Sequence, residues 1–528
     1  MKLHCLLIHF VVLAPLSVLF ADVPEPAGFC AQTSADDEWV VMVYNVENLF
    51  DIDGISLFED YAQDASGERD AYDAERLLTK IDNHSQIIAS CNGGRGPDIV
   101  ALQELEIDFS NDPSFSLEQA LEEYAEQTVA ELLGGEVVSP RISGFPIEFF
   151  LLKRLRELGI DDYSFVGPRF DPSWQQRGIA HRCAFLSRFP VVEVRQHPLY
   201  QARDILEVTF DIHGNELTVF NNHWKSGASS VRTEPIRIQN AGVLRVLLDQ
   251  LLVQNPAADI LLVGDFNSHH NQSLRMDAPF GVTAINSILG SQSVEAALLR
   301  SEADLYNLWY ELPQPERGSE VWMGEWGSLM QVIVTPGLYD SNGIQYVDNS
   351  FRRHLIPGVN VDAVTGEPIR WINLGSGAGY SDHIPVCASF RHARLHGKDS
   401  NLTPYHPDDL GSDAEQQHQA IWVNYSLEGR EIYSDLQRLT DQTPDSLLTE
   451  MGGLFQVEGI RRDGGIEVDG KLYGLYAPKP EVWQWLKNVP SGELMHFVGE
   501  FSVHRAQLQF LIQDLSWVQS PRSGGESE

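Results

Sequence analysis

The stretch ILLVGDFNSHH, residues 260–270, joins an apolar run to a set of polar side chains that could do chemistry. The apolar half is typical of a β-strand buried in a sheet. It stops at Asp265, and Asn267, His269 and His270 follow. Carboxylate and amide oxygens bind hard divalent cations, and imidazoles transfer protons. The junction is therefore a candidate reaction centre as well as a candidate turn.

Three further apolar runs adjoin polar residues in the same way. They lie in YNVENLFD, PDIVALQELE and YSDHIPV, and the polar residues are Asn45 with Glu47, Glu104, and Asp382 with His383. If these strands lie side by side, their ends converge on one edge of a sheet. The carboxylates and amides would then form an oxygen-rich site suited to Mg²⁺, Mn²⁺ or Ca²⁺.

A site of this composition could hydrolyse a phosphodiester. The substrate is an anion and repels hydroxide, but a divalent cation on a phosphoryl oxygen removes that repulsion and stabilises the added charge. A carboxylate can hold the attacking water in line, and an imidazole can protonate the departing oxygen. Asp, Glu, Asn and His are the residue types that this reaction needs.

The elements that would position these residues alternate between strand and helix. Residues 97–106 form a predicted buried strand, whereas residues 73–90 have the apolar spacing of a helix. Residues 237–256 predict a second helix, which Pro256 stops. Residues 111–160 contain an amphipathic segment and predict a helical insertion. Alternation of this kind indicates an α/β fold.

Five motifs, in their order and spacing, resemble the endonuclease/exonuclease/phosphatase superfamily over residues 37–392: YNVENLFD, PDIVALQE, NNHWKS, GDFN and SDHIPV. That superfamily includes pancreatic-type deoxyribonucleases and secreted sphingomyelinases. Several of the motifs look most like those of bacterial exported nucleases. The resemblance implies a four-layer α/β sandwich, with two packed sheets between helices and the site at their top edge. It also implies a Mg²⁺ cofactor, with Mn²⁺ or Ca²⁺ as alternatives.

The resemblance also assigns roles by position. The implied metal ligands are Asn45, Glu104 and Asp382, and the implied catalytic residues are His223, Asp265, Asn267 and His383, with a phosphate contact from Asn222. Asp265 is expected to orient or deprotonate the attacking water, and Asn267 to hold either the phosphate or that water. His383 is expected to contact the phosphoryl oxygen, and His223 to serve the transition state or the leaving group.

Several positions keep a simpler interpretation. Asp265 and Asn267 could form an Asx turn after a strand. Glu47 could cap or form a salt bridge rather than bind metal, and His269 and His270 could be ordinary surface or groove residues. Two arginines outside the motifs, Arg177 and Arg237, are candidate phosphate contacts, with an ordinary structural or solvated role as the alternative.

One position departs from the family pattern. The stretch SLMQVIVT (328–335) matches a strand in which family members carry an Asp that fixes and charges the histidine of the SDH motif, here His383. The matching residue is Met330, which cannot accept that hydrogen bond. We expect a substitute acid, with Glu325 and Asp340 nearby in sequence, or a different alignment of this stretch, or a less basic His383.

The C-terminal part changes character. Residues 393–417 lose apolar periodicity and predict a linker, and residues 418–520 predict a small β-barrel of the OB type. Aromatic residues on such a barrel can stack on bases. Residues 418–517 nevertheless carry 8 Lys and Arg against 14 Asp and Glu, which disfavours electrostatic binding of nucleic acid. The barrel could instead bind carbohydrate or brace the catalytic part.

Residues 1–21 read as a secretory signal peptide, with an uncleaved anchor as the alternative. We therefore expect export to the periplasm or beyond, where disulfides are permitted. The net charge of −38 favours solubility and argues against stable association with anionic membranes. A bound cation would still allow an anionic substrate. The oligomeric state stays open.

These observations predict an exported, divalent-metal-dependent phosphodiesterase that hydrolyses DNA or RNA. The alternative is a sphingomyelinase-like or small-molecule phosphodiesterase, for which an exposed aromatic hairpin within residues 309–326 would be the membrane contact. A third hypothesis is a binding protein on a decayed catalytic fold. Met330 favours that hypothesis, but the intact Glu104, Asp265 and His383 argue against it.

Overall fold

The structure is a computed structural model, and it describes residues 38–58, 72–110, 112–135, 137–277, 281–299, 304–393, 420–440, 443–504 and 507–519. The predicted signal peptide (1–21) and the predicted linker from residue 394 onwards lie outside these residues. Among the described helices, none is long and apolar enough to span a bilayer.

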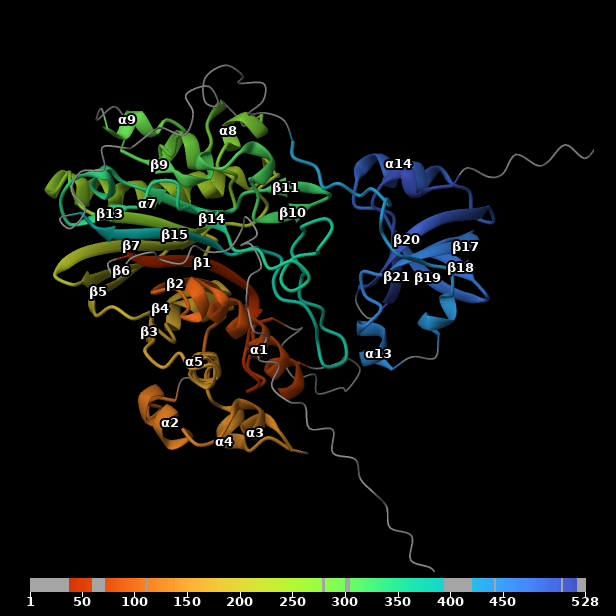
Figure 1. Ribbon diagram of the computed structural model, residues 1–528, viewed down its shortest axis with the longest axis horizontal. Helices are drawn as coiled ribbons and strands as arrows, with labels where there is room; N and C mark the ends of the chain where they lie inside the picture. The colour runs from red at the N-terminus through yellow and green to blue at the C-terminus, as the bar shows by residue number, and fades with distance from the viewer. Residues whose placement is uncertain are drawn as a thin grey trace, which may run out of the picture.

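Two β-sheets form the centre of the larger lobe (Figure 1). The first sheet contains β1 (Glu38–Leu49), β2 (Ile99–Glu106), β3 (Ser164–Val166), β4 (His181–Ser187), β13 (Ile344–Tyr346), β14 (Arg352–Arg353) and β15 (Val386–His392). Its strands lie in the order β13-β15-β1-β2-β4-β3, and β14 also pairs with β15. The second sheet contains β5 (Val191–His197), β6 (Ile205–Ile212), β7 (Asn215–His223), β8 (Ile260–Asp265), β9 (Tyr306–Asn307) and β12 (Met330–Val334). Its strands lie in the order β5-β6-β7-β8-β12-β9.

Helices cover the outer faces of both sheets (Figure 1). The helices of this lobe are α1 (Ala74–Ser90), α2 (Leu117–Glu123), α3 (Val129–Leu133), α4 (Pro140–Ser143), α5 (Ile147–Glu157), α6 (Pro172–Arg177), α7 (Glu234–Gln254), α8 (Gln272–Arg275) and α9 (Glu295–Leu299). Helices α1 and α5 pack on the first sheet, and α7 packs on the second. The predicted helical insertion corresponds to α2 to α5.

The strands are apolar on both faces, which is why the fold has four layers. In β1, Val41 and Val43 face the core between the sheets, whereas Val40 and Met42 face the core under α1 and α5. Strand β8 alternates in the same way between the central core and the core under α7. Side chains alternate between the two faces of a strand, so such runs require a covering layer on each side. The predicted four-layer α/β sandwich is confirmed.

Two parallel strand pairs bring the polar strand ends to one edge. Strand β1 pairs with β2, and β7 pairs with β8, so that His223 lies opposite Asp265. Close packing of β7 on β8 requires Gly264, whose φ is +127° and where a Cβ atom would lie 2.0 Å from the carbonyl oxygen of Asn222. The glycine of the GDFN motif is thus explained by the strand pair that it joins.

The C-terminal strands form a second, smaller body (Figure 1). Its elements are β16 (Ile432–Tyr433), β17 (Leu454–Arg462), β18 (Gly465–Val468), β19 (Lys471–Tyr476), β20 (Leu494–His504), β21 (Gln507–Leu511), α13 (Pro444–Leu448) and α14 (Pro480–Asn488). Pairing of β17 with β20 closes β17, β18, β19, β21 and β20 into a barrel. The predicted small β-barrel is confirmed.

A hairpin of the larger lobe joins the two bodies. It consists of β10 (Glu320–Trp322) and β11 (Glu325–Gly327). The Trp326 N–H donates to the Ile421 carbonyl, and the Val423 N–H donates to the Gly324 carbonyl. The Trp326 side chain also belongs to the apolar core of the barrel. The barrel is therefore anchored on an element that, as described below, borders the candidate site.

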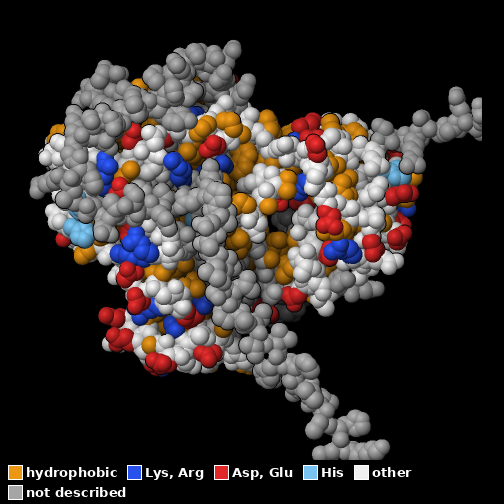
Figure 2. All heavy atoms as spheres, in the orientation of Figure 1, with side chains coloured by type: hydrophobic (Ala, Val, Ile, Leu, Met, Phe, Trp, Pro, Cys, Tyr) orange, Lys and Arg blue, Asp and Glu red, His pale blue; other side chains and the backbone are white. Residues whose placement is uncertain are grey.

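Cysteines and surface charge agree with an acidic, folded protein. Cys91 and Cys183 are free and buried, whereas Cys387 is disulfide-bonded. In Figure 2 acidic side chains are spread over both bodies on the face shown. The net charge of −38 disfavours a general electrostatic attraction for polyanions, so any such attraction has to be local.

Candidate active site

An open cavity of about 770 Å³ lies where the polar strand ends meet. Six of the residues predicted for the site line it: Glu104, His223, Asp265, Asn267, Asp382 and His383. The cavity is also lined by residues that the sequence did not single out, among them Arg203, Arg275, Glu320, Trp322 and Arg370. The central prediction, that separate strand ends share one cavity, is therefore correct in geometry.

Asn45 lies at the end of β1 and is fully buried beneath the cavity. Its Nδ2 donates to Glu104 Oε1 at 3.1 Å and to Asp265 Oδ2 at 3.3 Å. Its Oδ1 accepts the Glu47 N–H at 3.0 Å. The amide thus holds two carboxylates together, and only the second lone pair of Oδ1 remains for a cation. Asn45 is better placed to position Glu104 and Asp265 than to serve as a strong metal ligand.

Irregular backbone aims the side chains at the cavity. Glu104 has a φ of +68° and Asn267 a φ of +46°, conformations that side chains other than glycine rarely adopt. The register of β2 against β4 shifts between Leu102 and Leu105, as expected for a bulge at Glu104. The Asn267 turn is held by its N–H, which donates to Asp265 Oδ1 at 2.8 Å. Asp265 and Asn267 thus form an Asx turn and also line the cavity, so the two interpretations of this segment are compatible.

His223 ends β7 and lies between two carboxylates. Its Nε2 is 3.5 Å from Asp265 Oδ2 and 3.6 Å from Glu104 Oε1. Its ring stacks on His181, with centroids 5.4 Å apart and planes 3° from parallel. Burial lowers the pKa of His223 well below its usual value, and the nearby Arg203 and His181 lower it further. His223 is therefore neutral near pH 7.

His383 has the opposite charge state. Its Nε2 lies 3.7 Å from Asp382 Oδ1 and 3.8 Å from Asp265 Oδ2. Burial alone would lower its pKa, but Asp382, Asp265 and other carboxylates outweigh burial and raise the pKa to about 9. The His383 N–H donates to Ser381 Oγ at 3.1 Å, and Ser381 Oγ donates to the Asn45 carbonyl at 2.7 Å. The SDH segment is thus fastened to β1.

The three residues predicted as phosphate contacts do not line the cavity, and their polar atoms bond to other groups of the protein. The Asn222 amide donates to the Phe220 and Val263 carbonyls and accepts from Trp224. Asn222 points away because neighbouring residues in a strand face opposite sides, and His223 already faces the cavity.

The two arginines outside the motifs have structural roles. Arg177 makes a two-pronged ion pair with Asp204, with distances of 2.7 and 2.9 Å. Arg237 is fully buried, pairs with Glu234 at 2.6 Å and donates to the carbonyls of Lys225 and Gly227. Arg237 thereby shapes the loop around Gly227 that lines the cavity, without reaching the cavity itself.

The structure also shows the contacts of Glu47, His269 and His270, for which the sequence left a structural role as an alternative. Glu47 accepts the Trp371 N–H at 2.9 Å and lies 3.5 Å from the Arg370 guanidinium. These contacts match the alternative in which Glu47 forms a salt bridge. His269 lines the cavity, whereas His270 is buried, with its Nδ1 2.6 Å from Ser328 Oγ. His269 is therefore a groove residue and His270 a core residue.

Two models of the Endonuclease/Exonuclease/phosphatase family match the chain, one over residues 42–283 and the other over residues 187–392. Together they take in both strand pairs and the SDH segment. The chain belongs to the endonuclease/exonuclease/phosphatase family. Members of this family are hydrolases of phosphoester bonds, and the cavity residues of this chain are of the types that such a reaction needs.

Solved structures of family members resemble this chain only distantly. A truncated TDP2 of Caenorhabditis elegans is 13% identical, covers 67% of this chain and 97% of its own, and has a TM-score of 0.35. Sphingomyelinase C from Streptomyces griseocarneus is 14% identical, with 67% and 99% covered and a TM-score of 0.33. The human nocturnin catalytic domain with bound sulfate is 13% identical, with 67% and 94% covered and a TM-score of 0.33. No curated protein matches the sequence.

Glu320 is the carboxylate that approaches Nδ1 of His383 in this chain, which has Met330 where the family pattern has an Asp. Met330 pairs with Asp265 across β12 and β8, so it lies beside the site, but its thioether cannot hold His383 as a carboxylate would. Glu320 Oε2 lies 3.8 Å from His383 Nδ1 and accepts the Leu329 N–H at 3.1 Å. Gly327 makes room for it, because a Cβ atom there would lie 1.9 Å from Glu320 Oε1.

The two acids that the sequence suggested as substitutes are elsewhere. Glu325 binds the Arg275 guanidinium, and Asp340 accepts the Asn342 N–H in a turn after β12. The expectation of a substitute acid is therefore right in kind and wrong in residue. Burial raises the pKa of Glu320 to about 7, and the positive His383 opposes that rise.

The donor set fits the divalent cation that the family uses. Burial raises the pKa of the Glu104 carboxyl, and repulsion from Asp382 raises it further. Such mutual repulsion between oxygen donors is relieved by a hard cation between them. Glu104 and Asp382 would hold such a cation, with Asn45 behind Glu104. Arg370, 3.3 Å from Asp382, is the nearest competing positive group.

Proposed function

We propose that this protein is an exported, divalent-metal-dependent phosphodiesterase that hydrolyses nucleic acid. The observation that carries the proposal is the convergence of Glu104, Asp265, Asp382 and two histidines of opposite charge state on one open cavity. Export rests on residues 1–21 of the sequence.

The charge states divide the work between the histidines. His383 carries a proton near pH 7, so it can hold a phosphoryl oxygen and donate a proton to the departing oxygen. Neutral His223 can only donate one hydrogen bond to the phosphoryl group or accept one from water. We therefore give His383, rather than His223, the leaving-group role.

Asp265 is the residue placed to orient the attacking water. It lies within 3.8 Å of both His223 Nε2 and His383 Nε2, and Asn45 and Asn267 fix its two oxygens. Asn267, beside it on the cavity wall, can hold the same water or a phosphoryl oxygen. A bound cation would neutralise the phosphate and stabilise the charge that develops in the transition state.

Cations and one exposed aromatic favour a polyanionic substrate with bases. Arg203, Arg275 and Arg370 line the cavity of this otherwise acidic chain. Trp322 also lines it and is 61% exposed. Arginines can neutralise backbone phosphates, and an exposed indole can stack on a base at about 1–3 kcal/mol. This combination supports nucleic acid as the substrate.

A panel of substrates tests the proposal. Purified protein is incubated with Mg²⁺, Mn²⁺ or Ca²⁺ and with DNA, RNA, an abasic duplex or sphingomyelin vesicles, with and without chelator. We expect fragments from at least one nucleic acid, and none when the chelator is present. Release of phosphocholine without any nucleic-acid cleavage would reject the proposal in favour of a lipid phosphodiesterase.

A lipid phosphodiesterase is the second candidate because of the same hairpin. Of the three tryptophans between residues 309 and 326, Trp309 and Trp326 are buried, but Trp322 and the adjacent Met323 are exposed at the hairpin end. Exposed Trp and Met can insert into a membrane interface. The Arg-lined cavity behind them favours the polyanion, so the nuclease remains our first choice.

The role of Trp322 gives a separate prediction. Trp322→Ala is expected to raise KM for a single-stranded oligonucleotide about tenfold, with kcat little changed, because one stacking contact is lost. Trp422→Ala is the matched control, since Trp422 is 51% exposed but does not line the cavity. Equal KM values for the two variants would remove Trp322 from the substrate path.

Glu320 gives a prediction about pH. The negative Glu320 helps to raise the pKa of His383, so Glu320→Gln should lower that pKa. Activity that needs protonated His383 is present below its pKa and lost as the pH rises through it. The alkaline limb of the pH–kcat profile should therefore move to lower pH in the variant, at equal cation concentration. An unmoved alkaline limb would show that Glu320 is only structural.

A further inference from the structure

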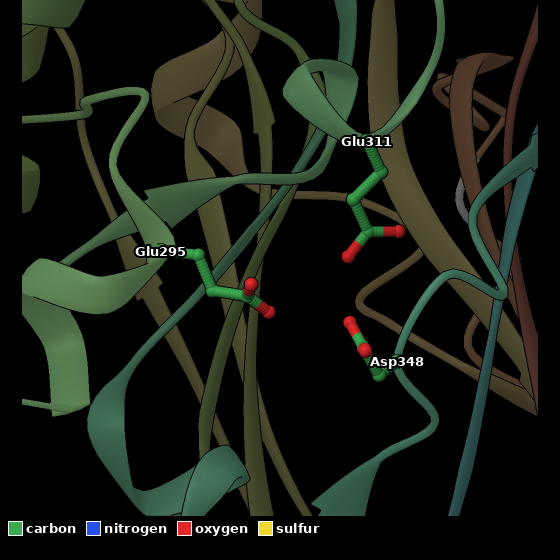
Figure 3. A group of neighbouring side chains, drawn as sticks. All are labelled: Glu295, Glu311 and Asp348. Atoms are coloured by element: carbon green, nitrogen blue, oxygen red, sulfur yellow. The ribbon is translucent and has the colours of Figure 1, made fainter. Parts of the chain in front are cut away.

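Three carboxylates meet at a second place, away from the active-site cavity. Figure 3 shows Glu295, Glu311 and Asp348 pointing toward one another, and one oxygen of each lies within 4.8 Å of the others. None of the three lines the active-site cavity. They come from α9, from the turn η4 (Leu308–Glu311) after β9, and from the segment after β13.

The spacing is that of ligands around one cation. Two oxygens bound to the same Ca²⁺ at about 2.3–2.6 Å lie no more than about 5 Å apart. All three carboxylates here satisfy that limit. Glu295 and Glu311 are each 3% exposed, whereas Asp348 is half-buried and leaves a path to solvent.

Buried polar atoms at the cluster still lack partners. Among the described residues, nothing forms a hydrogen bond with Glu295 Oε1, Glu311 Oε1 or the Tyr339 hydroxyl. Tyr339 is not one of the three acids and is itself only 3% exposed. It lies beside the cluster, because it ends the turn η6 (Pro336–Tyr339), which packs against α9, and its hydroxyl is near enough to Glu295 to lower the pKa of that carboxyl. An unpartnered buried oxygen costs about 1–3 kcal/mol, so a ligand at this place is expected.

The charges are also poorly balanced. Burial raises the pKa of Glu295 to about 7, and repulsion from Asp348 adds to that rise. Burial likewise raises the pKa of Glu311, and the hydrogen bond from Tyr346 and the charge of Arg352 offset only part of that rise. The Tyr346 hydroxyl donates to Glu311 Oε2 at 2.5 Å, which leaves Oε1 free to face the other acids.

We propose that Glu295, Glu311 and Asp348 bind a structural divalent cation, for which Ca²⁺ is the best match. The ligands come from three separate segments at irregular angles, an arrangement that Ca²⁺ accepts more readily than Mg²⁺. Because β9 is at the edge of the second sheet and β13 is at the edge of the first, the ion joins the two sheet edges to α9. This cation is distinct from the one proposed at Glu104 and Asp382.

The test removes the active-site cation first. In a Glu104→Gln full-length chain, calorimetry with Ca²⁺ alone should detect one bound ion. The melting temperature should rise by about 5 °C from chelator to a hundredfold excess of Ca²⁺ over Kd. Adding Glu311→Gln should abolish both signals, whereas adding Glu316→Gln, a nearby exposed carboxyl, should leave both unchanged.

Two results would overturn the proposal. One is the absence of a Ca²⁺-dependent melting shift in the Glu104→Gln chain itself, a measurement that needs no change in the cluster. The other is an equal shift with and without Glu311→Gln. If the acids merely share protons, Glu311→Gln should stabilise the chelated protein, and neither chain should respond to Ca²⁺. Asp348→Asn, at the half-buried ligand, replaces Glu311→Gln if that chain does not fold. None of these readouts depends on enzymatic activity.

Discussion

Asp265→Asn should reduce kcat for nucleic-acid cleavage about a thousandfold, with a much smaller change in KM. The substitution keeps the size of the side chain and the oxygen that accepts the Asn267 N–H. It removes the negative charge that orients the attacking water and that helps to raise the pKa of His383. Loss of a positioned base typically costs about 10²–10⁴ in rate. Steady-state kinetics at fixed Mg²⁺ measure the effect.

Asp204→Asn is the matched control for that variant. Asp204 is another buried carboxylate of the same lobe, but it binds Arg177 and Trp174 outside the active-site cavity. We expect it to lower the melting temperature while leaving kcat of the folded protein close to that of the wild type. If Asp265→Asn kept more than about a tenth of the wild-type kcat, Asp265 would not be the water-orienting residue.

His383→Gln is expected to lose about a thousandfold in kcat and to lose the alkaline limb of the pH profile. The wild type should lose activity as the pH rises through the pKa of His383, because the protonated form holds the phosphoryl oxygen and donates the proton. Glutamine can donate a hydrogen bond but has no proton to give. The pH dependence of kcat for the wild type and the variant measures this directly.

His197→Gln controls for the loss of an imidazole. His197 lies on β5 and pairs with Glu207 at 2.6 Å, away from the cavity. It should leave the pH profile unchanged. A His383→Gln variant whose profile kept the wild-type alkaline limb would mean that another group carries the proton, and the proposed division between the two histidines would fail.

The residues that the sequence located correctly all lie at strand ends. Glu104 and Asp265 lie near the carboxyl ends of strands that pair in parallel, whereas Asp382 precedes β15, which runs antiparallel to β1, so all three reach the same edge. Their convergence follows from sheet geometry, so a pattern of apolar runs and polar ends was sufficient to predict it. The four-layer sandwich was expected from the family resemblance, and strands that are apolar on both faces are its physical basis.

Sequence reasoning misplaced residues of two kinds. Some have bonding partners that are distant in sequence, and for others the side of the strand on which the side chain lies was not considered. Asn222 was assigned to the cavity with His223, although adjacent strand residues face opposite sides. Arg237 looked available at the start of a helix, but the loop around Gly227 folds back onto it. Only the second error depends on tertiary structure; the first could have been avoided from alternation alone.

Glu320 illustrates what the sequence could not reveal. It reaches His383 from a separate hairpin, and the reach depends on Gly327, which leaves space for the carboxylate. The search for a substitute acid near Met330 in sequence therefore found Glu325 and Asp340 instead. The same hairpin anchors the barrel through Trp326, and local sequence patterns do not predict that contact.

The most direct test uses a minimal phosphodiester, bis(p-nitrophenyl) phosphate, which does not depend on the natural substrate. Release of p-nitrophenol by the full-length protein is followed as Mg²⁺ is added to the chelated enzyme, alongside Glu104→Gln. We predict no hydrolysis with chelator, saturable hydrolysis with Mg²⁺, and a much higher Mg²⁺ requirement for Glu104→Gln. Equal rates with chelator and with Mg²⁺, or identical Mg²⁺ titrations for the two proteins, would contradict a metal-assisted reaction at these strand ends.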